Sequence, residues 1–482
     1  MSNKTRGALA ILAAGALTLS MAPNAFAQVK DDADPWAAYV TNEPGVHRIA
    51  DKDRISTAIE AAQSRDWGTK KLLTNKWQCE NPTAPQHNQQ TNQPLGAKQQ
   101  FTFWQGGKGG QFVQVTCTVV PDETTDHVNI IIARSDDYAD ALAATPLADV
   151  LDAPVLINPT AKLDDRNKNE IKRLSQKYGK DRTIVHILGG TAALSHDVEN
   201  AVDDIIDKTS DQPNTLRYQG IDRYETAVNI ARVTIGWYGI DSGANKYNAN
   251  VYVTTGKNFP DALAAGAAAA HNDGIVLLTN GDDMDRRGIT ERFIWNLNDW
   301  VSDTYGATGY QGAWMDKDPS QVKEDISTEL AEVLTMLWAA QTEHASFQNF
   351  NTNEVIAVGG PSDRALKAAD INVAKSFVGK DRYETATLTA SGTFKQHNTD
   401  DTLDTKNYAV VSGQSYADAL VASAYIANSD GPLLLSHADR LTPVTAQYLN
   451  DNVDELDRVF TFGGTGTLQK SVTDAIEKLL DY

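Results

Sequence analysis

Short apolar runs alternate with amphipathic stretches along most of the chain. The runs at 129–133, 251–255 and 408–411 are continuously apolar or β-branched, which is typical of strands buried on both faces of a sheet. Stretches with helical spacing lie between such runs, for example at 442–453 and 471–480. Strands that alternate with helices predict parallel sheets covered by helices and joined by right-handed crossovers. The pattern therefore predicts an α/β protein built from three-layer modules.

Four sequence blocks recur three times in the same order, at a period of about 160 residues. The first carries an Asp-Arg pair before a helical stretch, and the second carries Tyr/Phe-Ala/Pro-Asp-Ala-Leu after a strand. The third is an apolar run, and the fourth is a strand that ends in a glycine pair. The first block lies at 48–58, 217–227 and 376–386, and the second at 135–142, 256–263 and 413–420. The third lies at 153–157, 274–278 and 431–435, and the fourth at 185–190, 355–360 and 459–464. This period exceeds that of solenoid repeats, so we expect each copy to be a domain.

The repeats divide most of the chain into three tandem domains. Repeat 1 is expected at 44–212, repeat 2 at 213–370 and repeat 3 at 371–482. Repeat 1 carries an insertion at about 66–125, and repeat 2 carries one at about 282–350. Repeat 3 has no comparable insertion between its blocks and is the simplest copy.

The two insertions differ in their pattern. The insertion of repeat 1 contains two strand-like runs around a glycine-rich segment at 106–110, which predicts a β-hairpin. The insertion of repeat 2 contains helical stretches near 290–301 and 321–344. These helices either pack on their own domain or form a surface for a partner, and the sequence leaves both interpretations open.

The N-terminal 27 residues have the pattern of a secretory signal peptide. Lys4 and Arg6 precede an apolar run at 7–19, and a small-residue cleavage motif follows. A short acidic stretch at 28–43 comes next. We therefore expect a secreted protein, and no segment of the expected mature chain is apolar enough to span a membrane.

The chain contains two cysteines, Cys79 and Cys117. Exported proteins meet an oxidising environment, so the pair predicts one disulfide, which closes a loop of 38 positions. Two free thiols are the alternative. A disulfide across a loop of this size contributes roughly 3–4 kcal/mol in the chain-entropy model.

Composition and charge narrow the class of function. The net charge of −20 argues against a protein held on nucleic acid by a basic surface. The chain has no His-Glu-x-x-His, Cys-x-x-Cys or Gly-x-Ser-x-Gly motif, and no Gly-x-Gly-x-x-Gly follows a strand. We therefore expect neither a metal site nor a cofactor, and no enzyme activity. A carboxylate pair of the glycosidase type stays open among the 63 acidic residues.

The repeated polar residues are the candidate ligand-binding groups. They are the arginines of the Asp-Arg pairs and the aspartates of the second blocks: Arg54, Arg223 and Arg382, and Asp140, Asp261 and Asp418. A guanidinium can hold a carboxylate or phosphate through two hydrogen bonds. Ligands in open α/β sheets bind outside the carboxyl ends of the strands, where these residues are expected. The alternative is that each arginine pairs with an aspartate and only stabilises the assembly.

With these blocks in place, the chain resembles the cell wall binding repeat 2 family of exported Gram-positive proteins. The resemblance rests on Arg-x-x-Gly-x-Asp-Arg-Tyr-x-Thr-Ala, on the Asp-Ala-Leu block, on the apolar run and on the glycine pair. It implies three Rossmann-like (Toprim-like) modules around a pseudo-threefold axis. It also implies non-covalent attachment to anionic cell-wall polymers, such as a polysaccharide or a teichoic-acid-like polymer.

Repeat 1 departs from the family pattern at two positions. Asp51 stands where the other copies have Gly220 and Gly379, and Ile55 stands where they have a tyrosine. These departures make ligand binding by repeat 1 an open question.

The sequence favours a non-catalytic cell-wall-binding protein. Two alternatives are an envelope hydrolase and a surface scaffold or adhesin that uses the insertions. Loss of Lys4 and Arg6 with the signal would change the net charge from −20 to −22. An anionic polymer would then be repelled overall, so binding must rely on local arginines, bridging cations or a neutral ligand.

Overall fold

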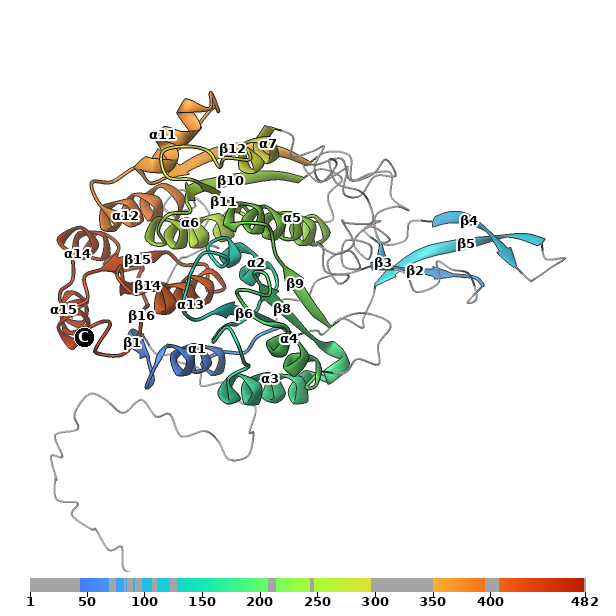
Figure 1. Ribbon diagram of the computed structural model, residues 1–482, viewed down its shortest axis with the longest axis horizontal. Helices are drawn as coiled ribbons and strands as arrows, with labels where there is room; N and C mark the ends of the chain where they lie inside the picture. Colours follow the sequence, from blue (N-terminus) through green and yellow to red (C-terminus); the bar gives the residue numbers. More distant parts are fainter. Residues whose placement is uncertain are drawn as a thin grey trace, which may run out of the picture.

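The structure is a computed structural model that describes residues 44–68, 75–81, 84, 90–91, 98–105, 111–121, 128–206, 214–242, 247–295, 350–394 and 407–480. Within these ranges the chain forms four sheets of four strands each. Three sheets are parallel and carry helices, whereas the fourth is antiparallel and lies to one side of them (Figure 1). The expected α/β fold with several parallel sheets is confirmed.

The three parallel sheets contain the strands of the repeats. The first sheet has the order β7-β6-β8-β9, with β6 (Val128–Arg134), β7 (Val155–Asn158), β8 (Thr183–Leu188) and β9 (Thr215–Tyr218). The second has the order β11-β10-β12-β13, with β10 (Tyr247–Thr255), β11 (Ile275–Thr279), β12 (Phe350–Val358) and β13 (Lys375–Phe377). The third has the order β1-β16-β14-β15, with β1 (Gly45–Ile49), β14 (Asn407–Ser412), β15 (Leu433–Ser436) and β16 (Arg458–Phe462). The strands predicted from continuous apolar runs are the central strands β6, β10 and β14.

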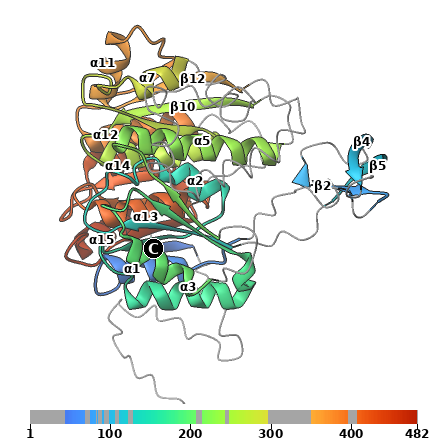
Figure 2. The same ribbon diagram turned by 45° about the vertical axis from the view of Figure 1, so that its right-hand side comes forward.

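Helices surround these sheets in two groups (Figures 1 and 2). Six of them follow the Asp-Arg and Asp-Ala-Leu blocks and pack toward the centre: α1 (Arg54–Gln63), α2 (Ala144–Val150), α5 (Arg223–Ser242), α6 (Pro260–His271), α12 (Arg382–Thr393) and α13 (Tyr416–Ala427). The others lie toward the periphery: α3 (Asp165–Tyr178), α4 (His196–Asp203), α7 (Ile289–Trp295), α11 (Gly360–Ala368), α14 (Pro443–Asn450) and α15 (Lys470–Leu479). Two 3-10 turns lie at Lys180–Arg182 and Val453–Glu455.

Each parallel sheet contains one strand from the neighbouring repeat. The first strand of repeat 2, β9, pairs with β8 of repeat 1, and the first strand of repeat 3, β13, pairs with β12 of repeat 2. The first strand of repeat 1, β1, pairs with β16 near the end of repeat 3, with Gly45 opposite Arg458 and Ile49 opposite Phe462. The three sheets therefore form a closed ring.

The strand exchange is made by a βαβ connection between neighbouring repeats. In repeats 1 and 2 the strand that ends in the glycine pair is followed by a helix and then by the first strand of the next repeat, whereas in repeat 3 the partner strand is β1 from repeat 1. The strand after the helix pairs in parallel with the strand before it, as β9 does with β8 and β13 with β12. The sequence repeats and the sheets are therefore offset by one strand.

Three short helices meet on the pseudo-threefold axis of the ring. The helices α2, α6 and α13 contact one another, and Thr145, Gly266 and Ser423 occupy the same repeat position on them. Thr145 Oγ1 and Ser423 Oγ lie 2.9 Å apart, and Ser423 Oγ donates to the carbonyl of Leu263 at 2.8 Å. A Cβ atom on Gly266 would lie 2.8 Å from Thr145 Cβ. Small side chains therefore allow the close contact of these alanine-rich helices.

The insertion of repeat 1 folds as a separate antiparallel sheet. Its order is β3-β2-β5-β4, with β2 (Asn75–Cys79), β3 (Gln90–Thr91), β4 (Lys98–Gln105) and β5 (Gln111–Pro121). The predicted hairpin is the β4–β5 pair, to which β2 and β3 add two strands. Trp77, Phe101 and Val115 are among the residues that form a small core of this sheet.

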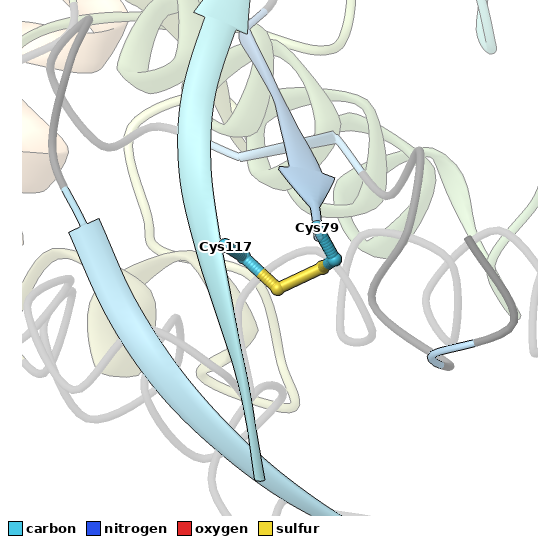
Figure 3. Close-up of a disulfide and its surroundings, with 2 residues drawn as sticks. All are labelled: Cys79 and Cys117. Carbon is cyan, nitrogen blue, oxygen red and sulfur yellow. A yellow bond between two sulfur atoms is a disulfide. The ribbon is translucent and has the colours of Figure 1, made fainter. Parts of the chain in front are cut away.

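The predicted disulfide is present in this sheet. Cys79 on β2 lies opposite Cys117 on β5, and their sulfur atoms are bonded (Figure 3). Both side chains are buried with the aromatic core of the sheet. The bridge therefore joins the first long strand of the insertion to its last.

Several expectations fall on residues outside the described ranges. These are the signal peptide at 1–27, the acidic stretch at 28–43, the glycine-rich turn at 106–110 and the second inserted helix at 321–344. The first inserted helix is represented by α7 (Ile289–Trp295). In the described part of the chain, no helix is both long enough and apolar enough to cross a membrane.

We predict that Gly266→Ala destabilises the ring although alanine favours a helix. The added Cβ would overlap the side chain of Thr145, and overpacking of this kind costs about 1–3 kcal/mol. The matched variant Gly266→Ala with Thr145→Gly moves the glycine to the facing helix and should recover at least half of the loss. Chemical unfolding measures both values. Equal stability of the single variant and the wild type would contradict the axial packing.

We also predict that the disulfide stabilises only the antiparallel sheet. Replacing Cys79 and Cys117 together by alanine should lower the stability of this sheet by about 3 kcal/mol, because a cross-linked loop has less entropy when unfolded. Amide hydrogen exchange should be faster in β2 and β5, while β6 and β10 keep their protection. Reduction of the wild type should give the same exchange pattern. An equal loss of protection in β6 would show that the bridge supports the parallel sheets as well.

Candidate functional site

The strand exchange brings the candidate residues together at three equivalent contacts between neighbouring repeats. The aspartate of one repeat lies beside its own glycine pair and faces the arginine of the next repeat. The electrostatic neighbours are Asp140 with Arg223, Asp261 with Arg382, and Asp418 with Arg54. The third pair depends on closure of the ring, because Asp418 belongs to repeat 3 and Arg54 to repeat 1.

The glycine pair accommodates the aspartate. The first glycine of each pair, Gly189, Gly359 or Gly463, has φ of 92°, 91° or 94°, a region that favours glycine. A Cβ atom there would lie within 3 Å of the carboxylate of the aspartate in the same repeat. The glycine therefore serves both the turn and the close approach of the carboxylate. Asp261 and Asp418 lie in the first turns of α6 and α13, as expected, whereas Asp140 precedes α2 by four residues.

Burial makes ionisation of these aspartates unfavourable. It raises the pKa of Asp261 to about 6, and the charge of Arg382 opposes this rise. Burial also raises the pKa of Asp140, where the Thr226 hydroxyl of repeat 2 is the main opposing group. The pKa of Asp418 is raised in the same way, although Ser415, Thr467 and Arg54 favour its charged form. Each carboxyl group thus lies at a contact between repeats, where burial favours its neutral form and the arginine of the next repeat favours its ionised form.

Each arginine is oriented by a backbone carbonyl of its own repeat. Nη1 of Arg54, Arg223 and Arg382 donates to the carbonyl oxygens of Ser135, Gly256 and Gly413 at 2.7, 2.6 and 2.6 Å, respectively. The preceding aspartates cap the helices, as the sequence predicts; Asp381 Oδ1, for example, accepts from the backbone N–H groups of Tyr383 and Glu384.

The alternative of direct Arg–Asp pairing is not seen as an ion pair. Among the described residues, none of the three arginines has a carboxylate oxygen within 4.0 Å. Arg54 and Arg382 are exposed, and Arg223 is half-buried. Each guanidinium is therefore fixed on one side and retains N–H groups that can hold an anionic oxygen.

An aromatic cluster on the axis was not recognised from the sequence as part of the site. Tyr138, Phe259 and Tyr416 contact one another, with ring centroids 5.7, 5.8 and 6.2 Å apart. The guanidinium carbon of Arg54 lies 5.9 Å from the Tyr416 ring centroid, and that of Arg223 lies 5.9 Å from the Tyr138 centroid. The signal was available, because an aromatic residue stands two positions before each candidate aspartate.

The departures of repeat 1 change only part of its site. The backbone N–H of Gly220 donates to Thr226 Oγ1 at 3.1 Å, and the N–H of Asp51 makes the equivalent bond to Thr57 Oγ1 at 3.3 Å. The turn is therefore kept. Ile55 lacks the hydroxyl group that Tyr224 uses to bond Asn280 at 3.0 Å. Repeat 1 thus keeps the oriented arginine and loses one polar contact beside it.

The three contacts between repeats offer the same set of polar and aromatic groups. Within the described ranges, no group of three or more His, Cys, Asp or Glu side chains could hold a metal ion. The recurring elements are an oriented guanidinium, a buried carboxyl group with a raised pKa, a backbone turn and an aromatic ring. These groups can hold a polar, anionic or ring-shaped ligand.

The chain is similar to two proteins of Bacillus subtilis (strain 168). It is 30% identical over 149 residues to N-acetylmuramoyl-L-alanine amidase LytC, a match that covers 30% of this chain and 24% of the amidase. It is 32% identical over 165 residues to the amidase enhancer, covering 34% of this chain and 20% of that protein. The chain therefore spans about a quarter or less of these curated relatives.

The fold is similar to that of Cwp6 from Clostridium difficile. The TM-score is 0.53 at 17% identity, and the match covers 91% of this chain and 48% of Cwp6. A family model for cell wall binding domain 2 (CWB2) matches residues 48–199, 217–313 and 377–473, which is well over half of the chain. With three matched segments that coincide with the three repeats, the chain belongs to the cell wall binding domain 2 family.

Proposed function

We propose that this protein is a non-catalytic module that attaches non-covalently to a cell-wall polymer through the three contacts between its repeats. The observation that carries the proposal is the threefold recurrence of one arrangement, an oriented arginine of one repeat beside the buried aspartate and glycine pair of the preceding repeat. Membership of the family and the similarity to Cwp6 support a cell-wall-binding role.

Repetition favours binding to a polymer rather than catalysis. Three equivalent sites on one rigid ring can engage a repeating ligand at once, so weak contacts give a strong attachment. LytC is an amidase by name, and the match covers only 24% of it. The similarity therefore supports a shared binding region and does not transfer the amidase activity to this chain.

The proposed ligand is an acidic or neutral wall polysaccharide, or a teichoic-acid-like polymer. The net charge of −20 opposes a polyanion at long range. At short range, Arg54 and Arg382 are exposed and can donate charge-assisted hydrogen bonds. Screening over about 10 Å at 0.1 M salt weakens the long-range repulsion more than these direct contacts.

We also propose that the protein is secreted and stays at the cell wall. The signal peptide predicted at 1–27 supports export, and we propose that the three repeats predicted at 44–212, 213–370 and 371–482 retain the protein at the wall. The unit of folding is offset from these boundaries by one strand, since each repeat completes its sheet with the first strand of the next.

Replacing Arg54, Arg223 and Arg382 together by glutamine should weaken binding to purified cell walls at least tenfold. A tenfold change corresponds to about 1.4 kcal/mol, which is less than the loss of one charge-assisted hydrogen bond can cost. Each single variant should have a smaller effect, because the other two sites remain. Sedimentation with purified walls measures the bound fraction.

The matched control is Arg182→Gln, which removes an equally exposed arginine remote from the three candidate pairs. Walls stripped of phosphate-containing polymers separate a teichoic-acid-like ligand from a polysaccharide. Unchanged binding of a folded triple variant would contradict the proposed sites. Lysis of the walls by the wild type would contradict the non-catalytic assignment.

Wall binding should also strengthen as the pH falls through the pKa of Asp261, which is about 6. Below this pH the carboxyl group is neutral, so it no longer competes with an anionic ligand for Arg382. Asp261→Asn should bind at neutral pH as the wild type binds in acid, and its affinity should depend less on pH. Wall sedimentation from about pH 7 to about pH 5 measures this. An identical pH dependence in both proteins would exclude Asp261 as its source.

A further inference from the structure

A cleft of about 990 Å³ lies where repeat 3 meets repeat 1. Its lining comes from β1, α1, α3 and α15 and from the glycine pair after β16, so ring closure creates it. Volumes of about 300–1,000 Å³ are typical of small-molecule sites. The cleft does not include Arg54 or Asp418, the candidate pair at this same contact.

Arg48 of β1 lines the cleft, and its equivalents are Arg217 in repeat 2 and Ser376 in repeat 3. Its Nη1 donates to the carbonyl oxygens of Gly463 and Leu468 at 2.7 and 2.8 Å, while its Nη2 is buried without a hydrogen-bond partner. Burial lowers the pKa of Arg48, and the charge of Asp474 only opposes this. Arg48 forms no ion pair within 4.0 Å with a described residue.

The other basic side chains of the cleft are neutralised. Arg166 pairs with Asp53 and Asp164, Arg173 pairs with Glu170, and Lys470 pairs with Asp474. Within the described lining, Arg48 is therefore the cation whose charge is not matched by a carboxylate in contact.

Repeat 2 has an arginine at the equivalent position, and that arginine is paired with a carboxylate. Arg217 of β9 occupies the position of Arg48, and its Nη1 makes the same bond to the glycine carbonyl, that of Gly189, at 2.8 Å. Its Nε and Nη2 donate to Glu199 Oε2 at 3.2 and 2.8 Å. Arg217 is 1% exposed, so this buried cation is paired.

The residue that neutralises Arg217 is replaced at the equivalent place in repeat 3. Glu199 lies ten residues after Gly189, and Thr473 lies ten residues after Gly463. Thr473 lines the cleft, and its hydroxyl bonds the carbonyl of Lys470 at 2.8 Å. A threonine has no charge to offer, so Arg48 lacks the carboxylate that this fold supplies one repeat away.

A second position in the lining of the cleft also differs between the copies. Glu225 of repeat 2 reaches back to the N–H of Ile221 and binds Arg287 at 2.6 Å, so a long acidic side chain fills that place. Repeat 1 has Ser56 there, and Ser56 lines the cleft. Ser56 Oγ accepts from Arg166 Nη1 at 2.7 Å, so this place carries a short neutral side chain in repeat 1 and a carboxylate in repeat 2.

We propose that this cleft binds the acidic group of a saccharide, with the Arg48 guanidinium holding a carboxylate or phosphate oxygen where Glu199 holds Arg217. The sugar hydroxyls then bond the carboxylates and amides of the lining, of which Glu60 and Gln63 are two. Burial raises the pKa of Glu60 to about 7, so this side chain can donate as well as accept a hydrogen bond near neutral pH. The inference deepens the proposed function, since it names an acidic saccharide as a ligand, and it uses a separate site.

Titration calorimetry with the full chain tests the cleft with glucuronate, glucose 6-phosphate and glucose. We expect glucuronate or glucose 6-phosphate to bind one site with a dissociation constant of about 1 mM or below, and glucose at least tenfold more weakly. Binding of glucuronate alone would identify a carboxylate ligand, and binding of glucose 6-phosphate alone a phosphate ligand. Equal binding of glucose, or no binding of either acid, would overturn the proposal.

The decisive variant is Thr473→Glu, which gives Arg48 the same carboxylate partner that Arg217 has. It should fold at least as stably as the wild type and bind the acids at least tenfold more weakly, because the introduced carboxylate now pairs with the Arg48 guanidinium. The neutral control Thr473→Gln, of similar size, should keep the affinity within about threefold. Unchanged binding in the folded Thr473→Glu variant would overturn the proposal. Wall sedimentation tests the three contact sites separately, so either result can fail without the other.

Discussion

The pairing of each repeat's first strand with the preceding repeat's last strand is the constraint on which the rest of the structure depends. It makes three short sheets into one ring, and the parallel β1–β16 pair closes this ring. No repeat completes its sheet alone, so the contacts between repeats are as fixed as the interior of a domain. Residues at those contacts are therefore held in place by the hydrogen bonds of a shared sheet, whereas residues at an ordinary domain interface can move relative to one another.

The exchange also explains the polar residues at each contact. A parallel strand brings its carboxyl end to the edge where the next repeat begins, so the glycine turn of one repeat meets the Asp-Arg helix of its neighbour. The buried aspartate is opposed by the arginine across the contact without a direct ion pair. An acidic chain with a net charge of −20 thus presents local positive groups at these contacts, and the proposed anionic ligand would bind to them.

Much of this could be predicted from the sequence, because the relevant signals are local. Apolar runs identified β6, β10 and β14, the aspartates before α1, α5 and α12 identified helix caps, and the two cysteines identified the bridge. The exchange of strands could not be predicted, because an apolar strand looks the same whichever sheet it joins. The repeated aromatic position could be seen in the aligned repeats, but only the structure shows that the three rings contact one another on the axis. The second inserted helix, at 321–344, stays a prediction.

The comparison of copies within one chain reveals more than any copy alone. Three repeats with one fold provide internal controls, since a residue in one can be judged by the partner its equivalent has in another. Arg217 with Glu199 shows what a satisfied arginine at this strand position requires. Arg48 is half-buried and keeps its carbonyl bonds, but Thr473 stands where a carboxylate would neutralise its charge, and a cation removed from water without such a partner is costly. In our proposal a ligand in the adjoining cleft supplies that partner. Ring closure places the first block of repeat 1, which departs most from the repeat pattern, beside the glycine pair of repeat 3. The contact between repeats 3 and 1 is therefore chemically distinct from the other two contacts.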